Sequence, residues 1–180
     1  MRERFFVAVA GTPGVGKTAF SSKLAGKVNA RLVDLKEYAV ERNLVSGRDK
    51  ERDTLVVDEG ELKRRLSREF SSSRGDFVVE GLLAPFTPAT HVIALRCSPR
   101  ELARRLKKRG YGRKKIKENV EAEVLGVCLH DSLWCENLLE LDVTRGFDVG
   151  EAVAWLKKGG RKIKRMNWFK EYAKMLEEGF

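Results

Sequence analysis

Short apolar runs alternate along the chain with longer segments whose apolar residues recur every three or four positions. The runs that are apolar enough to lie inside a sheet span residues 5–10, 29–33, 76–81, 91–96 and 138–143. The segments with helical spacing span residues 17–28, 35–42, 58–70, 100–109, 116–127 and 148–157. Strands that alternate with helices predict an α/β fold, in which a parallel five-stranded sheet lies between helices.

A glycine-rich segment joins the first strand to the first helix. It contains the P-loop pattern in its strand-loop-helix setting and reads Gly11-Thr12-Pro13-Gly14-Val15-Gly16-Lys17-Thr18. In such a loop, backbone N–H groups converge on phosphates, the lysine reaches the β- and γ-phosphates, and the threonine hydroxyl binds Mg²⁺. The predicted nucleotide-binding residues are Gly14, Gly16, Lys17, Thr18 and Ala19, and Lys17 is also predicted to be catalytic.

An acidic residue, Glu80, ends the buried run at residues 76–81. Ligands of α/β sheets gather at the carboxyl ends of the strands, and in P-loop kinases an acid at such a position lies beside the Mg²⁺ of the nucleotide. We therefore predict that Thr18 and Glu80 are the metal-binding residues, and that Glu80 is also catalytic. The alternative is a carboxylate that only marks the end of a strand.

Cations crowd the end of the helix at residues 100–109. Arg105 and Arg109 are four residues apart and so share a helix face, from which two guanidinium groups could flank one nucleotide. Arg109 is also predicted to be catalytic. The helix at residues 116–127 follows a short basic loop, which predicts a helix-loop-helix lid that closes over the γ-phosphate and excludes water. An ordinary solvated basic face would have the same pattern.

The final segment, residues 161–180, has apolar residues at helical spacing and basic residues elsewhere. The pattern predicts a basic amphipathic helix. Its apolar stripe either packs on the rest of the protein, as most such stripes do, or contacts RNA or a protein partner.

Composition bounds the class of protein. A chain of 180 residues is long enough for one domain with a normal core. The formal net charge of +10 favours a polyanionic partner such as RNA, although highly charged surfaces are also common in thermophile proteins. The three cysteines have no paired spacing, so we expect reduced thiols. We find neither a membrane-spanning run nor a signal-peptide pattern, and expect a cytoplasmic protein.

Three motifs together resemble one family of P-loop kinases. They are the P-loop, the Val-Val-Asp-Glu sequence at residues 56–59, and the segment 105–119 followed by Glu121-Ala122-Glu123. Over residues 5–143 the chain is similar to the atypical adenylate kinases called isoenzyme six, the coilin-interacting nuclear adenylate kinase family, which has archaeal members.

The resemblance implies a nucleoside monophosphate (NMP) kinase fold and the reversible reaction of MgATP with AMP to give two ADP. It implies an NMP-binding region at 34–57 and a lid at 109–119. Because Gly159-Gly160 interrupts the helical pattern, we also expect a P-loop kinase domain at residues 1–158 and a basic amphipathic extension at 159–180. Asp34 and Arg42 then belong to the AMP site, and Arg105 and Arg109 to the ATP site. Leu82 and Val40 depart from the family, which often has His and Arg at these positions.

The same resemblance implies ATPase activity and a role in maturation of the small ribosomal subunit, through a small-subunit ribosomal protein and with possible rRNA contact. An alternative function is therefore an ATPase switch in ribosome assembly, for which AMP phosphorylation is incidental. A kinase for another small acceptor would have a similar P-loop and lid.

Overall fold

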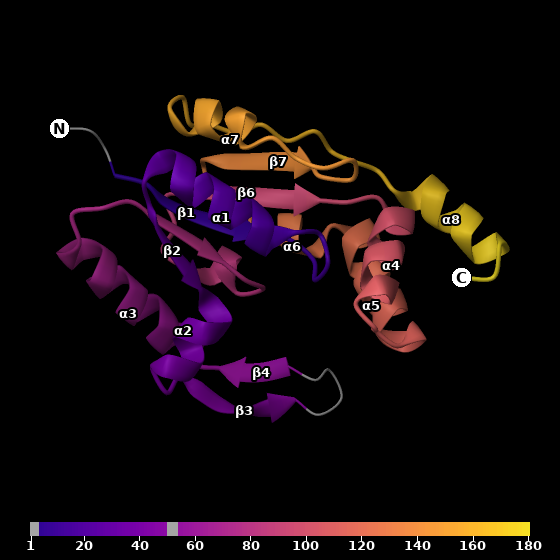
Figure 1. Ribbon diagram of the computed structural model, residues 1–180, viewed down its shortest axis with the longest axis horizontal. Helices are drawn as coiled ribbons and strands as arrows, with labels where there is room; N and C mark the ends of the chain where they lie inside the picture. The colour runs from indigo at the N-terminus through magenta and orange to yellow at the C-terminus, as the bar shows by residue number, and fades with distance from the viewer. Residues whose placement is uncertain (1–3, 50–53) are drawn as a thin grey trace.

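A five-stranded parallel sheet forms the centre of the molecule (Figure 1). The computed structural model describes residues 4–49 and 54–180. The sheet has the order β2-β5-β1-β6-β7, with strands β1 Phe6–Ala10, β2 Arg31–Asp34, β5 Phe77–Glu80, β6 His91–Arg96 and β7 Leu138–Asp142. The predicted α/β class and its parallel five-stranded sheet are confirmed.

Helices cover both faces of this sheet because its strands are apolar on both sides. Val7 and Val9 of β1 face one core, whereas Phe6 and Ala8 face the other. The first core is closed by α1 Lys17–Val28, α4 Pro99–Lys108, α5 Arg113–Leu125 and α7 Val149–Leu156. The second is closed mainly by α2 Leu35–Glu41, α3 Glu59–Ser72 and the 3₁₀ turn η1 Ala84–Phe86.

Strand β1 is central in the sheet, with β5 on one side and β6 on the other. The loop that follows β1 therefore begins in the middle of the carboxyl edge, between the ends of its two neighbours. This is the edge at which open α/β sheets bind ligands. The topology alone places the glycine-rich loop between Glu80 at the end of β5 and Arg96 at the end of β6.

An antiparallel hairpin lies apart from the main sheet (Figure 1). It consists of β3 Val45–Asp49 and β4 Thr54–Val57 and belongs to the predicted NMP-binding region. Residues 50–53 of that region lie outside the described residues. Asp58 caps the following helix by accepting the backbone N–H of Glu61.

The C-terminal segment is only partly helical. The prediction of a helix over residues 161–168 is wrong, because α8 spans only Phe169–Glu177. Before α8 the chain runs beside β7, where Lys162 exchanges backbone hydrogen bonds with Leu138 and Glu140. Sheet pairing, an interaction between distant segments, thus overrides local helical spacing. Helix α8 then packs against α4 (Figure 1).

Candidate functional site

The glycine-rich loop has the backbone form that its sequence requires. Gly14 and Gly16 have φ values of 96° and 111°, in the region that glycine tolerates and other residues avoid. At Gly14 space is also short, because an added Cβ would lie 2.8 Å from a methyl group of Leu106 on α4. The loop and α4 therefore approach each other closely, and the next helix begins at Lys17.

The ammonium group of Lys17 lies within the curve of the loop. Its Nζ donates to the carbonyl oxygen of Gly11 at 2.8 Å and contacts that of Thr12 at 3.4 Å. Burial lowers the pKa of Lys17, whereas the nearby Cys128 and Glu80 oppose that shift. A partly desolvated ammonium group is a strong partner for phosphate, because little water remains to compete.

Thr18 and Glu80 meet at the carboxyl edge of the sheet. The Thr18 hydroxyl donates to a Glu80 carboxylate oxygen at 2.7 Å. Burial is the main cause of a raised pKa for Glu80; the Thr18 hydrogen bond lowers it, and the neighbouring carboxylate of Asp34 raises it. Asp34 and Glu80 are register partners in β2 and β5. The structure thus brings together two predicted metal-binding residues and the predicted AMP-site residue Asp34.

These oxygen atoms fit a hard divalent cation such as Mg²⁺, which is usually bound by one or two protein oxygens together with substrate phosphates. Within residues 4–49 and 54–180, no cluster of three or more His, Cys, Asp or Glu side chains could hold a metal ion.

Arg105 is engaged with the protein backbone. Its guanidinium group donates to the carbonyl oxygens of Val15 at 2.8 Å and of Val143 and Thr144 at 2.9 Å each. Its Nε also donates to Glu101. Arg105 therefore braces the P-loop against the loop that follows β7, a positioning task that sequence spacing does not reveal.

Arg109 follows α4 and is exposed at the predicted lid. Its charge is close enough to Lys17 to lower the pKa of that lysine. The helices α4 and α5 pack against each other, which is the predicted helix-loop-helix arrangement. Of the two predicted arginines, Arg109 is the one whose charge acts on the P-loop lysine.

The two predicted AMP-site residues lie at opposite ends of α2. Asp34 caps its beginning by accepting the N–H groups of Lys36 and Glu37. Arg42 follows its end, where the guanidinium group lies 3.5 Å from Glu69 of α3 and over the ring of Tyr38. The structure therefore brings Asp34, but not Arg42, to the Thr18–Glu80 pair.

Sequence reasoning did not identify the buried polar residues behind the loop. Thr12 donates to Glu123 of α5, which pairs with Arg96 of β6. Arg96 also pairs with Glu140 of β7. The sequence does contain a sign of this network. Arg96 and Glu140 interrupt strands that are otherwise nearly all apolar, and charges buried in such strands require partners.

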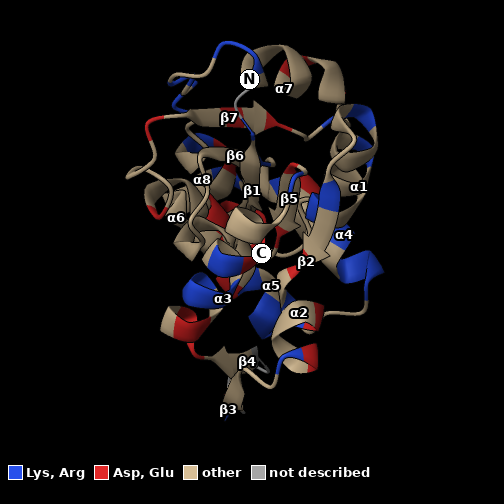
Figure 2. Ribbon diagram, turned by 90° about the vertical axis from the view of Figure 1, so that its left-hand side faces the viewer, with Lys and Arg blue, Asp and Glu red and all other residues tan. Residues whose placement is uncertain are grey.

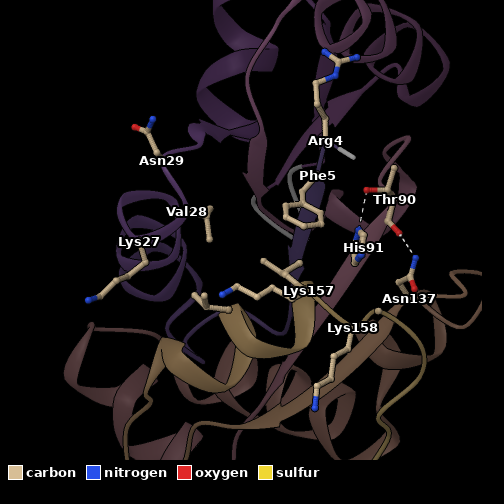
Figure 3. A pocket seen from close by; sticks show the side chains of 13 residues that line it. Arg4, Phe5, Lys27, Val28, Asn29, Thr90, His91, Asn137, Lys157 and Lys158 are labelled. Carbon is tan, nitrogen blue, oxygen red and sulfur yellow. Dashed lines mark hydrogen bonds between the residues drawn. The ribbon is translucent and has the colours of Figure 1, made fainter. Parts of the chain in front are cut away.

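A cavity of about 690 Å³ lies at the opposite, amino edge of the sheet (Figure 3). Lys157 reaches across it, whereas Lys27 and Lys158 point away. The ring of His91 lies 5.2 Å from that of Phe5 and 5.4 Å from that of Trp155. This histidine is thus a packed core residue, and the cavity is separate from the P-loop.

The fold and the Lys17–Thr18–Glu80 arrangement define a P-loop nucleotide-binding protein. Residues 7–126 match a family model described as "AAA domain". A "Putative adenylate kinase" of Thermococcus kodakarensis is 40% identical over 175 residues, which cover 94% of this chain and 96% of the relative. Another of Methanocaldococcus jannaschii is 31% identical over 169 residues, covering 92% and 94%. The chain therefore belongs to the AAA domain family, and it is related over nearly its whole length to these archaeal putative adenylate kinases.

Solved structures support the fold. A gluconokinase from Sinorhizobium meliloti has a TM-score of 0.53 at 18% identity, over 87% of this chain and 94% of its own. A shikimate kinase from Bacteroides thetaiotaomicron has a TM-score of 0.51 at 21% identity, over 76% and 85%. Among the described residues, no helix has the length and apolar character needed to cross a membrane.

Proposed function

We propose that this protein is an adenylate kinase that transfers the γ-phosphoryl group of MgATP to AMP. The observation that carries the proposal is the contact of Thr18 with Glu80 beside Lys17, at the edge where the P-loop opens. The names of the archaeal relatives support AMP as the acceptor. The motifs shared with the isoenzyme-six adenylate kinases support the same assignment.

In this proposal each residue has a stated task. The N–H groups from Gly14 to Ala19 bind phosphate oxygens at the start of α1, and Lys17 stabilises negative charge on the transferred group. Thr18 and Glu80 would hold Mg²⁺, which would neutralise negative charge on the phosphates of the nucleotide. Arg109 adds a cation from the lid, and Asp34 lies on the acceptor side. Phosphoryl transfer of this kind depends on positioning and electrostatics and needs little covalent participation by the protein.

A second candidate is an ATPase in small-subunit ribosome assembly, with a ribosomal protein or rRNA as partner. The observation that favours it is the distribution of charge. Residues 100–117 contain ten Lys and Arg and one Glu, so this segment has a formal charge of +9 in a chain whose total is +10. A segment with such an excess, which overlaps the predicted lid, is suited to a polyanion as well as to a nucleotide.

The deciding measurement is ADP formation from MgATP with and without AMP, in parallel with phosphate release. We expect AMP-dependent ADP formation without matching phosphate release, and expect Lys17→Ala to abolish it while the protein stays folded. Lys27→Ala is the matched control, since this exposed lysine lies on the same helix, away from the loop. Phosphate release that ignores AMP would favour the ATPase, and turnover that survives in Lys17→Ala would contradict the site.

A further inference from the structure

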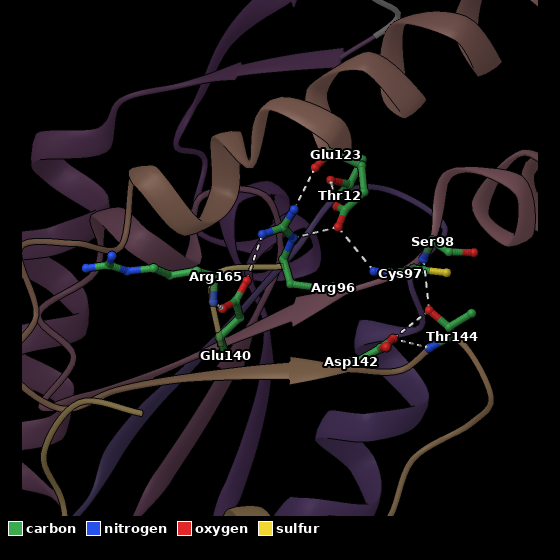
Figure 4. Close-up of polar contacts among 9 residues, drawn as sticks. All are labelled: Thr12, Arg96, Cys97, Ser98, Glu123, Glu140, Asp142, Thr144 and Arg165. Atoms are coloured by element: carbon green, nitrogen blue, oxygen red, sulfur yellow. Dashed lines mark hydrogen bonds and ion pairs between the residues drawn. The ribbon is translucent and has the colours of Figure 1, made fainter. Parts of the chain in front are cut away.

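A buried ionic network lies behind the P-loop (Figure 4). Arg96 donates from Nε to Glu123 at 2.7 Å and from a terminal nitrogen to Glu140 at 2.9 Å. The three side chains are 3%, 1% and 0% exposed. Charges so far from water persist only when each is fully paired. The network therefore fixes the geometry of its members closely.

Glu123 has both carboxylate oxygens occupied. One accepts from Arg96 Nε and from the backbone N–H of Cys97 at 3.1 Å, and the other accepts from the Thr12 hydroxyl at 2.5 Å. Arg96 also donates to the backbone carbonyl of Glu123 at 2.8 Å. This carboxylate therefore cannot rotate without breaking several hydrogen bonds at once.

Thr12 is the second residue of the glycine-rich loop and is itself buried. Its carbonyl oxygen accepts from the N–H of Val15 at 3.3 Å and lies 3.4 Å from Nζ of Lys17. By fixing Thr12, the Glu123 carboxylate thus also fixes the turn of the loop at Val15 and the position of the Thr12 carbonyl oxygen beside Lys17. Glu140 belongs to the same network, but its carboxylate accepts from Arg96 and from the backbone N–H of Arg165.

We propose that Glu123 is a positioning residue for the phosphate-binding loop, which it holds through Thr12 in the shape that receives the phosphates of ATP. Arg96 in turn holds Glu123. The inference rests on the proposed nucleotide binding and adds to it a residue from the lid helix α5. The loop that binds ATP and the helix that carries the lid are thereby joined by one buried hydrogen bond.

Stability alone does not test this role, because breaking either ion pair of Arg96 lowers the melting temperature. The test compares two isosteric variants, Glu123→Gln and Glu140→Gln. Each removes one of the two carboxylate charges that face Arg96, but only Glu123 touches the loop. The readouts are the Kd for ATP by titration of the folded protein and the KM values for ATP and AMP, all measured well below the melting temperatures.

We expect both variants to melt earlier and only Glu123→Gln to bind ATP more weakly, by roughly tenfold, as for loss of one charge-assisted hydrogen bond. The KM for AMP should stay within about twofold of the wild-type value, a change that corresponds to a small difference in binding free energy. Thr12→Val should reproduce the weaker ATP binding, and Thr12→Ser, which keeps the hydroxyl, should restore it.

Equal ATP affinities for Glu123→Gln and Glu140→Gln would overturn the inference. So would wild-type affinity in Thr12→Val, which also serves as the test if Glu123→Gln does not fold. A wild-type chain that binds no ATP would overturn the proposed function itself. Wild-type binding that all the variants retain would overturn only the role of Glu123.

Discussion

At the residue scale, Glu80 has an environment that disfavours its negative charge, as is typical of functional sites. It is buried, it lies beside another carboxylate, Asp34, and its pKa is raised, so its charged form is disfavoured in the folded protein. A residue that served only to end a strand would have no need of this charge. Proteins keep such unfavourable groups where activity requires them.

We therefore predict that Glu80→Gln raises stability at neutral pH while lowering Mg²⁺-dependent turnover. The amide keeps an acceptor for Thr18 and removes the repulsion from Asp34, so the melting temperature should rise by roughly 2–4 °C, as for a gain of about 1 kcal/mol. Turnover should fall roughly 10–100-fold.

The pH dependence gives the control for this prediction. A raised pKa means that protonated Glu80 is favoured by folding, so its stabilising contribution is present at low pH and is lost as the pH rises through the folded-state pKa. The advantage of Glu80→Gln should therefore be full at pH 7 and vanish below a pH of about 4.3. An advantage that does not change between pH 4 and pH 7 in thermal melts would contradict the assignment of this carboxylate.

At the element scale, the C-terminal segment is a structural support for the lid. Tyr172 of α8 donates to Glu121 of α5 at 2.7 Å, and Arg113 of α5 donates to the carbonyl oxygen of Gly179. Met175 is buried, and Trp168 packs on the core. The packing alternative for the apolar stripe is therefore the one that the contacts favour.

We predict that a chain ending at Gly160 is less stable and still folded. It loses the pairing with β7 and the burial of several large side chains, a loss on the order of 3 kcal/mol, which corresponds to a fall of roughly 6–12 °C in melting temperature. Calorimetry or circular dichroism would measure it. Glu178→Ala is the control, since its ion pair with Arg100 is exposed and such pairs contribute little. A truncated chain that melts like the full chain would show that α8 is undocked in solution.

The sequence predicts correctly those elements that depend on short-range patterns of residues. The P-loop and the five strands depend on neighbours within a few residues, so motif spacing and periodicity locate them. The extended run before α8 and the brace formed by Arg105 depend on partners tens of residues away. The pairing of Arg96 with Glu123 and Glu140 joins three elements, and no single spacing encodes it.

At the scale of the whole molecule, the charge excess has one main source. Residues 100–117, which lie in the helical hairpin formed by α4 and α5, contribute a formal +9, so the remaining 162 residues have a formal charge of only +1. Lys and Arg are blue in Figure 2, which shows them on α4 among other elements. Because burial removes few of these charges from water, the hairpin is the part of the protein expected to attract a polyanion.

The last prediction concerns single-stranded RNA of simple sequence. Binding of this RNA to the protein should weaken as salt is added. A plot of the logarithm of the binding constant against the logarithm of the salt concentration should have a slope of about 0.7 in magnitude for each phosphate neutralised. Replacing the exposed Lys107, Lys108 and Lys114 by Gln should therefore lower the slope by about 2. The matched control replaces three exposed lysines elsewhere, Lys36, Lys63 and Lys157. Fluorescence anisotropy of labelled RNA at several salt concentrations measures the salt slope of each variant.

The two triple variants have the same net charge, so a difference between them isolates the position of the charge from its amount. A lower salt slope only in the Lys107, Lys108 and Lys114 variant would place RNA on the hairpin of α4 and α5. MgATP should then compete with RNA, because Arg109 on the same hairpin acts on Lys17. Equal slopes in the two variants would mean that net charge alone attracts RNA. In that case the lid cations would serve the nucleotide, and the ribosome-assembly candidate would lose the observation that favours it.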